Sequence, residues 1–283
     1  MYVERLYPEL IPYLSTVKSP QAILASVTKT YFREKVGIAK GDLLHYAIAP
    51  CQMKKEEAKK QALWIYNDEP NIDAVLTTTE MADLIKEWPL DIHTLSKGEF
   101  DNPLGIASGA GAIFGTSGGV MEAAMRTAYF LLTGSDMENY ELIDVRNTGL
   151  KREGHFNLAG HELNICTVNS LVEIKPILEE IKTTGKSKYQ FIEVMNCPGG
   201  CIGGTGQWCT NPEILKKRRE ALFQYDREHK YRTSYGNEYI QNIYKDYFGA
   251  PNNAKAKEVM HLHYQDRSQE PGENFTCKIT DNQ

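Results

Sequence analysis

Apolar and polar positions along the chain follow two spacings, one typical of strands and the other of helices. Short apolar runs between turn residues predict buried strands, and they cover residues 43–50, 74–76, 140–145, 163–168 and 189–195. Apolar positions at helical spacing predict helices, which cover residues 19–37, 77–88, 119–134 and 169–185. This order of elements predicts an α/β fold with a parallel or mostly parallel sheet flanked by helices.

Local signals mark the ends of several of these helices. Ser19-Pro20 is a capping serine followed by proline at the first helical position. Thr77 and Glu80 have the spacing of a capping box, and Asn169-Ser170 can cap the helix that Gly185 ends. This last helix joins two predicted strands, which makes a βαβ unit with parallel strands.

The pattern changes after Asn211-Pro212, where only helices are predicted. Helical spacing continues through Phe223 and from Tyr239 to Phe248. From about Ser268 the composition is typical of a disordered tail. We therefore expect a main unit over residues 1–210, a helical segment over 211–267 and a tail over 268–283.

Composition and charge exclude several classes of partner. The chain has 283 residues and a formal net charge of -5, which argues against a nucleic-acid surface. No apolar run reaches the length of a membrane span, and the amino terminus lacks a signal-peptide pattern. We expect a cytoplasmic protein that binds neither nucleic acid nor membranes.

The most informative segment follows the last predicted strand, where Cys197 and Cys201 lie among five glycines. Two nearby thiols in a glycine-rich loop indicate a disulfide, part of a zinc site or part of an iron-sulfur site. Zinc sites normally have two such pairs, and no second short-spaced pair is present. A cluster that accepts one distant cysteine fits better. Cys51 is the candidate, because it follows a predicted strand and parallel strands share one sheet edge at their carboxyl ends.

Other reactive residues have simpler interpretations. Cys166 lies in an apolar run and is expected to be buried. Cys209 is expected to have a structural or incidental role, and Cys277 is expected to be free in the tail. His261-x-His263 could be a metal pair on a strand or two ordinary surface residues. The glycines of 105–119 lack the lysine of a phosphate loop, which argues against nucleotide binding there.

Longer motifs carry a resemblance to a known family. The run EVMNCPGGCIGGTGQ at 193–207 resembles the third signature of the iron-only hydrogenases, and PCQMKKEE at 50–57 resembles the second. FDNPLG at 100–105 and SGAGAIFGTSGGVMEAAMR at 108–126 are similar to further stretches of that family. The similarity runs in order from Tyr2 to about Tyr264, and residues 211–267 resemble the family's small-subunit segment.

The resemblance implies reversible reduction of protons to hydrogen at a six-iron cofactor. This cofactor is a 4Fe-4S cubane joined through a cysteine sulfur to a two-iron subcluster with carbon monoxide and cyanide ligands. Cys51, Cys197 and Cys201 would be cubane ligands, and Cys201 would bridge to the two-iron centre. Thiolates are suitable ligands for iron-sulfur clusters.

The resemblance also implies roles for residues around the cofactor. Lys54 would donate a charged hydrogen bond to a cyanide ligand, although without the resemblance it would be interpreted as a surface lysine. Ser15 would take part in a proton relay, although it would otherwise be interpreted as a turn residue. The remaining residues implied to line the cofactor are Gln21, Pro50, Phe114, Gly115 and Met195.

The sequence departs from the family pattern at several positions. Ala49 stands where the family usually has methionine, and Thr205 and Trp208 replace a glycine and a proline. The first signature, with the fourth cluster cysteine and the relay cysteine, does not precede Tyr2. We therefore expect a carboxyl-terminal part of a hydrogenase catalytic domain, with the amino-terminal half supplied by another chain or a longer gene.

The resemblance further implies ferredoxin or another electron carrier as a partner, together with maturation proteins. Two alternatives remain open from the sequence. One is a non-catalytic iron-sulfur protein similar to the hydrogenase-like cytosolic assembly factors, or a sensor, and the other is an inactive fragment.

Overall fold

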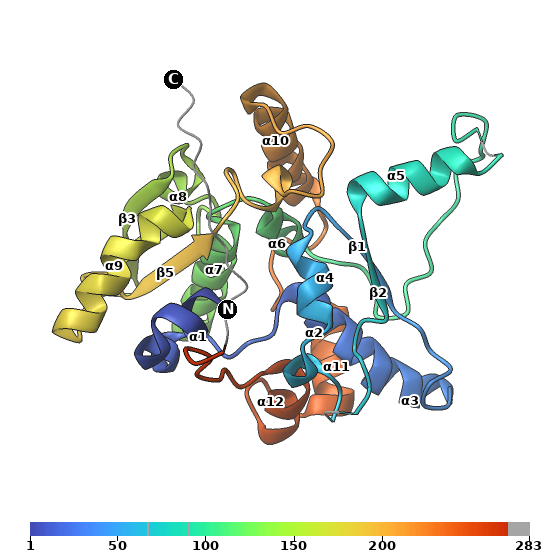
Figure 1. Ribbon diagram of the computed structural model, residues 1–283, viewed down its shortest axis with the longest axis horizontal. Coiled ribbons are helices and arrows are strands. Elements are labelled where there is room, and N and C mark those ends of the chain that lie inside the picture. The colour runs from blue at the N-terminus through green and yellow to red at the C-terminus, as the bar shows by residue number, and fades with distance from the viewer. Residues whose placement is uncertain (67, 90, 271–283) are drawn as a thin grey trace.

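The computed structural model describes residues 1–66, 68–89 and 91–270, so Cys277 and most of the predicted tail lie outside the described residues. Its strands form two separate sheets (Figure 1). The strands are β1 (Tyr46–Ala49), β2 (Ala74–Thr77), β3 (Lys151–Leu158), β4 (His161–Asn169) and β5 (Phe191–Met195). The helices are α1 (Tyr2–Leu6), α2 (Pro20–Val27), α3 (Arg33–Val36), α4 (Met53–Ala58), α5 (Thr78–Glu87), α6 (Gly109–Ala112), α7 (Gly119–Thr133), α8 (Ile143–Arg146), α9 (Leu171–Thr184), α10 (Pro212–Glu228), α11 (Glu238–Ile243) and α12 (Ala254–Met260).

The predicted fold class is confirmed, but not every predicted strand. Both β1–β2 and β4–β5 are parallel, while β3 pairs antiparallel with β4. The segment 140–145, predicted as a strand, instead leads into α8. The carboxylate of Glu122 accepts a hydrogen bond from the backbone amide of Leu142 at 3.0 Å, so this part of the chain has a partner other than a strand. β3 was not predicted, since its sequence is mostly polar.

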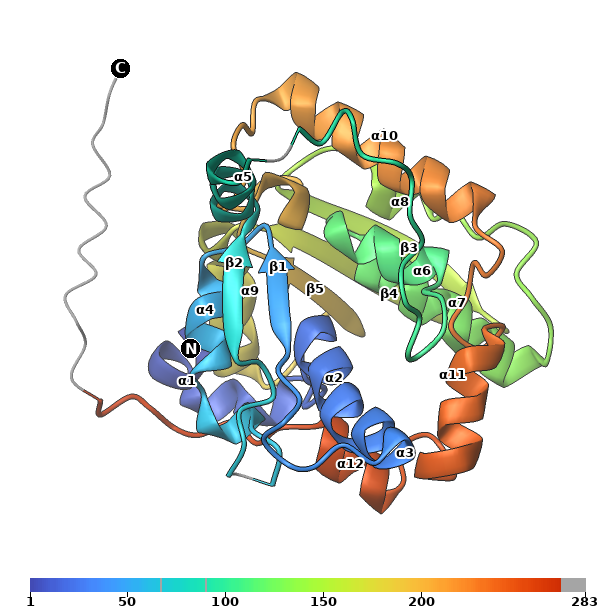
Figure 2. The ribbon, with the colours of Figure 1, turned by 90° about the vertical axis from the view of Figure 1, so that its right-hand side faces the viewer.

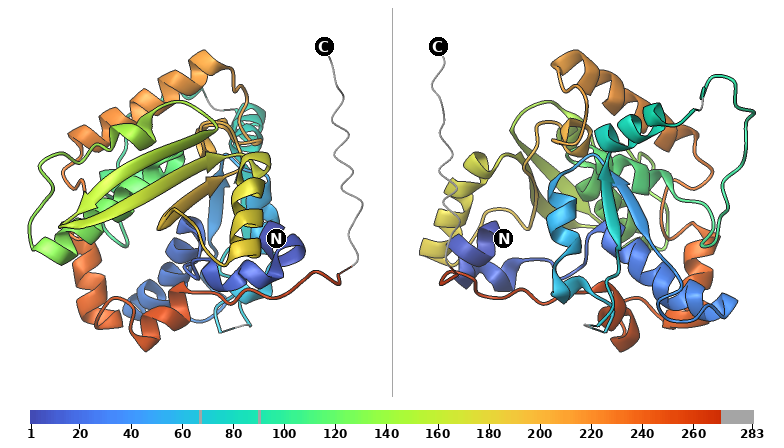
Figure 3. Two further views of the ribbon diagram at one scale, coloured as in Figure 1. Left: turned by 90° about the vertical axis from the view of Figure 1, so that its left-hand side faces the viewer. Right: turned by 45° about the vertical axis from the view of Figure 1, so that its right-hand side comes forward.

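Helices cover both faces of the three-stranded sheet, which the left view of Figure 3 shows from one side. Cys166 and Val168 of β4 pack against α9 through Ile174 and Ile177. Ile165 points to the other face, where it packs with Met121 of α7. Side chains alternate along a strand, so β4 contributes to two apolar cores. The expectation that Cys166 is buried is confirmed.

The two-stranded sheet is covered by helices on one face. Ala47, Ala49 and Val75 pack with Ala25 of α2. The capping box predicted at the start of α5 is present, with the Thr77 side chain and the Glu80 backbone joined as expected. In Figure 2 the two strands face the viewer, with α2 to one side and α4 to the other.

The helices after residue 211 pass around the rest of the molecule, with α10 at one end and α11 and α12 at the other (Figure 2). Asp226 of α10 is fully buried and accepts two hydrogen bonds from Arg126 of α7, at 2.9 and 2.8 Å. At the other end, α12 packs on α2. His261 then forms a β-bridge with Val17, and the backbone amide of Arg267 donates to Glu4 at 2.9 Å.

Candidate functional site

The glycine-rich loop directly after β5 is shaped by backbone conformations that favour glycine. Gly199 and Gly200 have φ angles of +77° and +95°. The backbone amide of Gly200 donates to the carbonyl of Cys197 at 3.0 Å, and Cys201 begins the short 3₁₀ helix η5 (Cys201–Gly203). Both cysteines are half-buried. The loop therefore turns back on itself and holds two thiols near each other without burying them fully.

A second loop, between η4 (Ile113–Gly115) and α7, packs directly against the first. The backbone amide of Ser117 donates to the carbonyl of Gly199 at 3.0 Å. A Cβ at Gly200 would lie 2.6 Å from the nitrogen of Ser117, so only glycine permits this approach. Glu193 of β5 is buried and accepts hydrogen bonds from the amides of Gly118 and Met121, at 2.6 and 2.7 Å. This carboxylate fixes the start of α7 relative to the cysteine loop.

The loop that carries Cys51 meets the same glycine-rich segment from the other sheet. The backbone amide of Gly206 donates to the carbonyl of Pro50 at 3.1 Å. A Cβ at Gly206 would lie 3.0 Å from the nitrogen of Cys51. The prediction that Cys51 and the Cys197 loop share the edge of one sheet is wrong, because β1 and β5 belong to different sheets. The loops come together because glycines let their backbones touch.

The three thiols lie close enough to influence one another's ionisation. Burial raises the pKa of Cys201, the Lys54 ammonium opposes this, and the negative charges of Cys51 and Cys197 raise the pKa further. Burial also raises the pKa of Cys197, and the charge of Cys51 adds to the effect. Cys51, Cys197 and Cys201 therefore form one electrostatically coupled group, which disfavours three free thiolates unless a cation shares the charge.

Lys54 lies at this group and is part of a short polar chain. Its ammonium is 2.5 Å from a carboxylate oxygen of Glu57, and the other oxygen accepts a hydrogen bond from Ser19, the cap of α2. The Lys54 side chain is half-buried, and its charge acts on Cys201, which the surface-lysine interpretation did not predict. Sequence reasoning missed Glu57 and Ser19 as its partners. The three-residue spacing of Lys54 and Glu57 on a helix was the available signal.

The other residues implied by the resemblance differ in their burial and in their contacts. Gln21 follows Ser19 on α2, and its side-chain nitrogen is buried without a hydrogen-bond partner. Gly115 packs against the loop, because a Cβ at Gly200 would lie 3.0 Å from its carbonyl oxygen. Phe114 and Met195 are half-buried beside these segments. Ser15 is exposed, and its hydroxyl accepts only a 3.4 Å hydrogen bond from the amide of Val17.

The donor set fits an iron-sulfur cluster better than a single ion. Across residues 1–66, 68–89 and 91–270, no three His, Cys, Asp or Glu side chains converge as ligands of one metal ion. A cubane differs, because each thiolate binds a separate corner iron. Three soft thiols in mutual electrostatic range agree with such a cluster.

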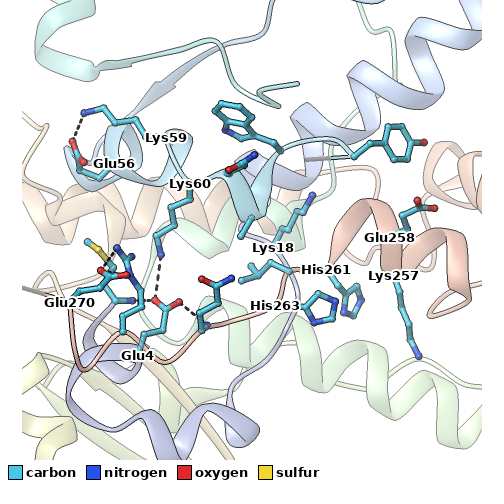
Figure 4. Close-up of a pocket in the computed structure, with 18 residues that line it drawn as sticks. Glu4, Lys18, Glu56, Lys59, Lys60, Lys257, Glu258, His261, His263 and Glu270 are labelled. Carbon is cyan, nitrogen blue, oxygen red and sulfur yellow. Dashed lines mark hydrogen bonds and ion pairs between the residues drawn. The ribbon is translucent and has the colours of Figure 1, made fainter. Parts of the chain in front are cut away.

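The remaining sequence candidates lie elsewhere. Cys209 is half-buried and contacts the side-chain nitrogen of Asn211 at 3.8 Å. His261 shares a 2.8 Å hydrogen bond with Thr16, and with His263 it lines a cavity of about 870 Å³ (Figure 4). Burial lowers the pKa of Lys18, in the wall of this cavity, to about 8. None of the three clustered cysteines lines this cavity, so its polar residues are separate from the thiol site.

Comparison with known proteins now decides the family. The model for the iron only hydrogenase large subunit, C-terminal domain, matches residues 1–205, and that for the iron hydrogenase small subunit matches residues 212–267. The chain belongs to the iron-only hydrogenase family. The resemblance to this family that the sequence motifs indicated is confirmed. No helix in the described part of this hydrogenase-family chain is long and apolar enough to cross a membrane.

Individual relatives of this hydrogenase-family chain include both enzymes and assembly factors. It is 36% identical to the NADP-reducing hydrogenase subunit HndD of Solidesulfovibrio fructosivorans over 93% of its own length and 45% of that protein. It covers 73% of a solved FeFe hydrogenase chain from Chlamydomonas reinhardtii, with 36% identity and a TM-score of 0.79. It is also 27% identical to a cytosolic Fe-S cluster assembly factor of Danio rerio, over 93% of this chain and 65% of that one. The chain thus spans less than half of the first of these relatives.

Replacing Gly204 with alanine tests the contact between the two cysteine loops. A Cβ at Gly204 would overlap the carbonyl oxygen of Pro50, so the loops must separate. We expect the affinity for an anaerobically reconstituted iron-sulfur cluster to fall by about 10 to 100-fold, the usual cost of disturbing residues around a metal site. Iron and sulfide content would be measured. Gly98→Ala is the control, since a Cβ there meets nothing within 4 Å; equal loss in both variants would contradict the prediction.

Proposed function

We propose that this chain is part of an iron-only hydrogenase that catalyses the reversible reduction of protons to hydrogen. The observation that carries the proposal is the convergence of Cys51, Cys197 and Cys201 from two sheets into one coupled group with Lys54 beside it. Membership of the hydrogenase family supports it. The matches over residues 1–205 and 212–267 also support a main unit at 1–210 and a small-subunit-like segment at 211–267.

The three cysteines would hold a 4Fe-4S cubane, with Cys201 also bridging to a two-iron subcluster that carries carbon monoxide and cyanide. When bound, this cofactor supplies the redox chemistry that interconverts protons and hydrogen. Burial, followed by the mutual repulsion of thiolate charges, raises the pKa of Cys201 in the free chain, and iron would displace the thiol protons and neutralise those charges. The glycines let the loops approach one another closely, and the backbone of Thr205 donates a hydrogen bond that lowers the pKa of Cys197, against the larger effect of burial.

Neighbouring residues would position and stabilise the cofactor. The Lys54 ammonium, held by Glu57, would donate to a cyanide ligand, and the unsatisfied amide nitrogen of Gln21 offers a second donor. Half-buried Phe114 and Met195 would pack against the two-iron subcluster, together with Pro50 and Gly115. Ser15 would act in proton delivery from the exposed side.

In this proposal, the complete enzyme would also use groups supplied by other segments or proteins. A fourth thiolate for the cubane would come from an amino-terminal segment on another chain or upstream in a longer gene. Ferredoxin or another electron carrier would exchange electrons with the cluster, and maturation proteins would install the two-iron subcluster. The size of the relatives supports this arrangement, since this chain covers 45% of the Solidesulfovibrio subunit.

The second candidate is a non-catalytic iron-sulfur protein. It is favoured by the similarity to the Danio rerio assembly factor, which covers 93% of this chain. The two candidates differ in whether the protein carries the two-iron subcluster. Detecting that subcluster, rather than the cubane, therefore distinguishes them.

Infrared spectroscopy on protein matured anaerobically with hydrogenase maturation proteins tests the proposal. Absorption bands of iron-bound carbon monoxide and cyanide, with hydrogen evolution from reduced ferredoxin when the amino-terminal half is supplied, are the expected results. An iron-loaded protein that shows neither bands nor hydrogen under those conditions would support the assembly-factor candidate. Protein that binds no iron at all would exclude both.

A further inference from the structure

The cavity of about 870 Å³ in Figure 4 lies between three segments that hydrogen bonds hold together. The backbone amide of Lys18 donates to the carbonyl of Met260 at 2.8 Å, and the amide of Leu262 donates to the carbonyl of Thr16 at 2.8 Å. The Lys18 ammonium also donates to the carbonyl of Leu63, which lies in the third segment, at 3.1 Å. The walls of the cavity are therefore positioned by contacts to the backbone.

Lys18 is a buried cation in the wall of this cavity without a counter-charge. It is 4% exposed, and its ammonium has only neutral hydrogen-bond partners, the carbonyl of Leu63 and the hydroxyl of Ser26 at 3.5 Å. Burial lowers the pKa of this ammonium to about 8, and no carboxylate among the described residues opposes the shift. An amine with this pKa is mostly protonated at neutral pH. An anion in the cavity would compensate its buried charge.

Two histidines give the same cavity further capacity for positive charge. His261 and His263 both line it, two positions apart in an extended segment whose alternate side chains face one side (Figure 4). Burial lowers the pKa of His261, and the charges of Lys257 and His263 lower it further. Positive groups in this part of the wall therefore repel one another. An anion bound beside them would relieve that repulsion.

Most acidic residues that line the cavity already have a cationic partner. The ion pairs are Glu4 with Lys60 at 3.6 Å, Glu56 with Lys59 at 2.8 Å and Glu270 with Arg267 at 2.6 Å. Outside these pairs, the lining contains Lys18 and Lys257 against the single carboxylate of Glu258, with the two histidines in addition. The charge left over is therefore positive.

The cavity has room for more than a single ion. Its volume lies within the range of about 300–1,000 Å³ that is usual for small-molecule sites. Trp64 and Tyr66 also line it, and their flat rings can stack on a planar group of a ligand. Cations and aromatic rings in one cavity are the groups that bind the phosphate and the base of a nucleotide.

We propose that this cavity binds the phosphate group of a small molecule, with Lys18, His261 and His263 as the groups that compensate its charge. A phosphate ester carries a charge of about −1.5 to −2 near pH 7 and three strong acceptor oxygens, so it matches several cations at once. Inorganic phosphate and a nucleotide both present this group. None of the lining residues belongs to the thiol group. The inference therefore lies beyond the proposed hydrogenase function and does not depend on it.

Calorimetric titration of the metal-free full chain with adenosine diphosphate, and separately with orthophosphate at the same ionic strength, tests the proposal. We expect one adenosine diphosphate to bind per chain. Lys18→Met should weaken this binding by at least about tenfold, because it removes the buried charge. Lys59→Met is the matched control, since Lys59 also lines the cavity but is exposed and paired with Glu56. It should change the affinity by less than about twofold.

The two probes also identify the source of the phosphate group. Orthophosphate that binds at least as tightly as adenosine diphosphate would identify free phosphate as the ligand, whereas tighter binding of adenosine diphosphate would identify a nucleotide. Absence of binding by both, or an equal loss in Lys18→Met and Lys59→Met, would overturn the proposal.

Hydrogen exchange on the unmodified chain gives a readout that needs no variant. Saturation with the tighter-binding probe should slow the exchange of backbone amides in residues 257–263, which form one wall of the cavity. Protection confined to the glycine-rich residues 105–119 would place the ligand elsewhere and overturn the proposed site.

Discussion

Changing Cys201 to alanine is expected to remove most of the cluster iron while leaving the chain folded. The substitution deletes only one sulfur at the start of η5, and the local backbone is held by hydrogen bonds among Cys197, Gly200 and Gly203. Two protein thiolates would then remain, and alanine offers no replacement ligand for iron. In the proposed assignment Cys201 also bridges to the two-iron subcluster, so both parts of the cofactor lose an attachment.

The experiment compares iron and sulfide content after anaerobic reconstitution, and carbon monoxide and cyanide bands after maturation. Cys209→Ala is the matched control, because Cys209 is also half-buried and lies eight residues further along the chain, yet it contacts Asn211. We expect iron near background for Cys201→Ala and wild-type content for Cys209→Ala, with unchanged circular dichroism in both. Full iron content in Cys201→Ala would contradict the proposed ligand set.

The second large effect is expected for stability, at the buried ion pair between α7 and α10. Arg126 and Asp226 are both fully buried, and Arg126 also contacts Glu122 at 2.5 Å. Removing one partner of such a pair leaves an uncompensated buried charge. We therefore expect Asp226→Ala to lower the free energy of unfolding by about 3–5 kcal/mol. Denaturant unfolding would measure the loss, and Glu220→Ala, at an exposed position of α10, is the control.

The same ion pair predicts that the stability of the folded protein depends on pH. Burial alone would raise the pKa of Asp226, but hydrogen bonds from Arg126 and Arg232 hold it below the ordinary value. A carboxylate with a lowered pKa in the folded state stabilises the protein above its unfolded pKa of about 3.9 and loses this contribution as the pH falls. Asp226→Asn should therefore flatten the stability profile in acid. An unchanged acid profile would contradict this account.

Local signals predicted the element ends correctly, because their causes lie within a few residues. Ser19, Thr77 and Ser170 cap α2, α5 and α9 as expected, and Gly134 and Gly185 end α7 and α9. The strand β3 was missed because its pairing depends on β4. Its hairpin turns at Ala159-Gly160, where both residues have positive φ, and alanine gives little sign of such a turn.

The candidate site was predictable in composition but not in arrangement. The spacing of Cys197 and Cys201 indicated a disulfide or part of a metal site, an iron-sulfur cluster was favoured, and Cys51 was expected beside them. Strand patterns could not show that the cysteine loops follow strands of two different sheets, because the contact between Gly206 and Pro50 is made by backbone atoms. The proposed roles of Gln21, Met195 and Ser15 remain predictions, since they come from the resemblance alone.

The helical segment after residue 211 is attached near both of its ends. Asp226 joins it to α7, and the residues after α12 pair with Val17 and with Glu4. Because the segment is attached to the body at two separate places, breaking one attachment does not release it. A proteolytic cut between α10 and α11 should therefore leave both pieces associated with the body, and the nicked protein should elute from a sizing column as one particle.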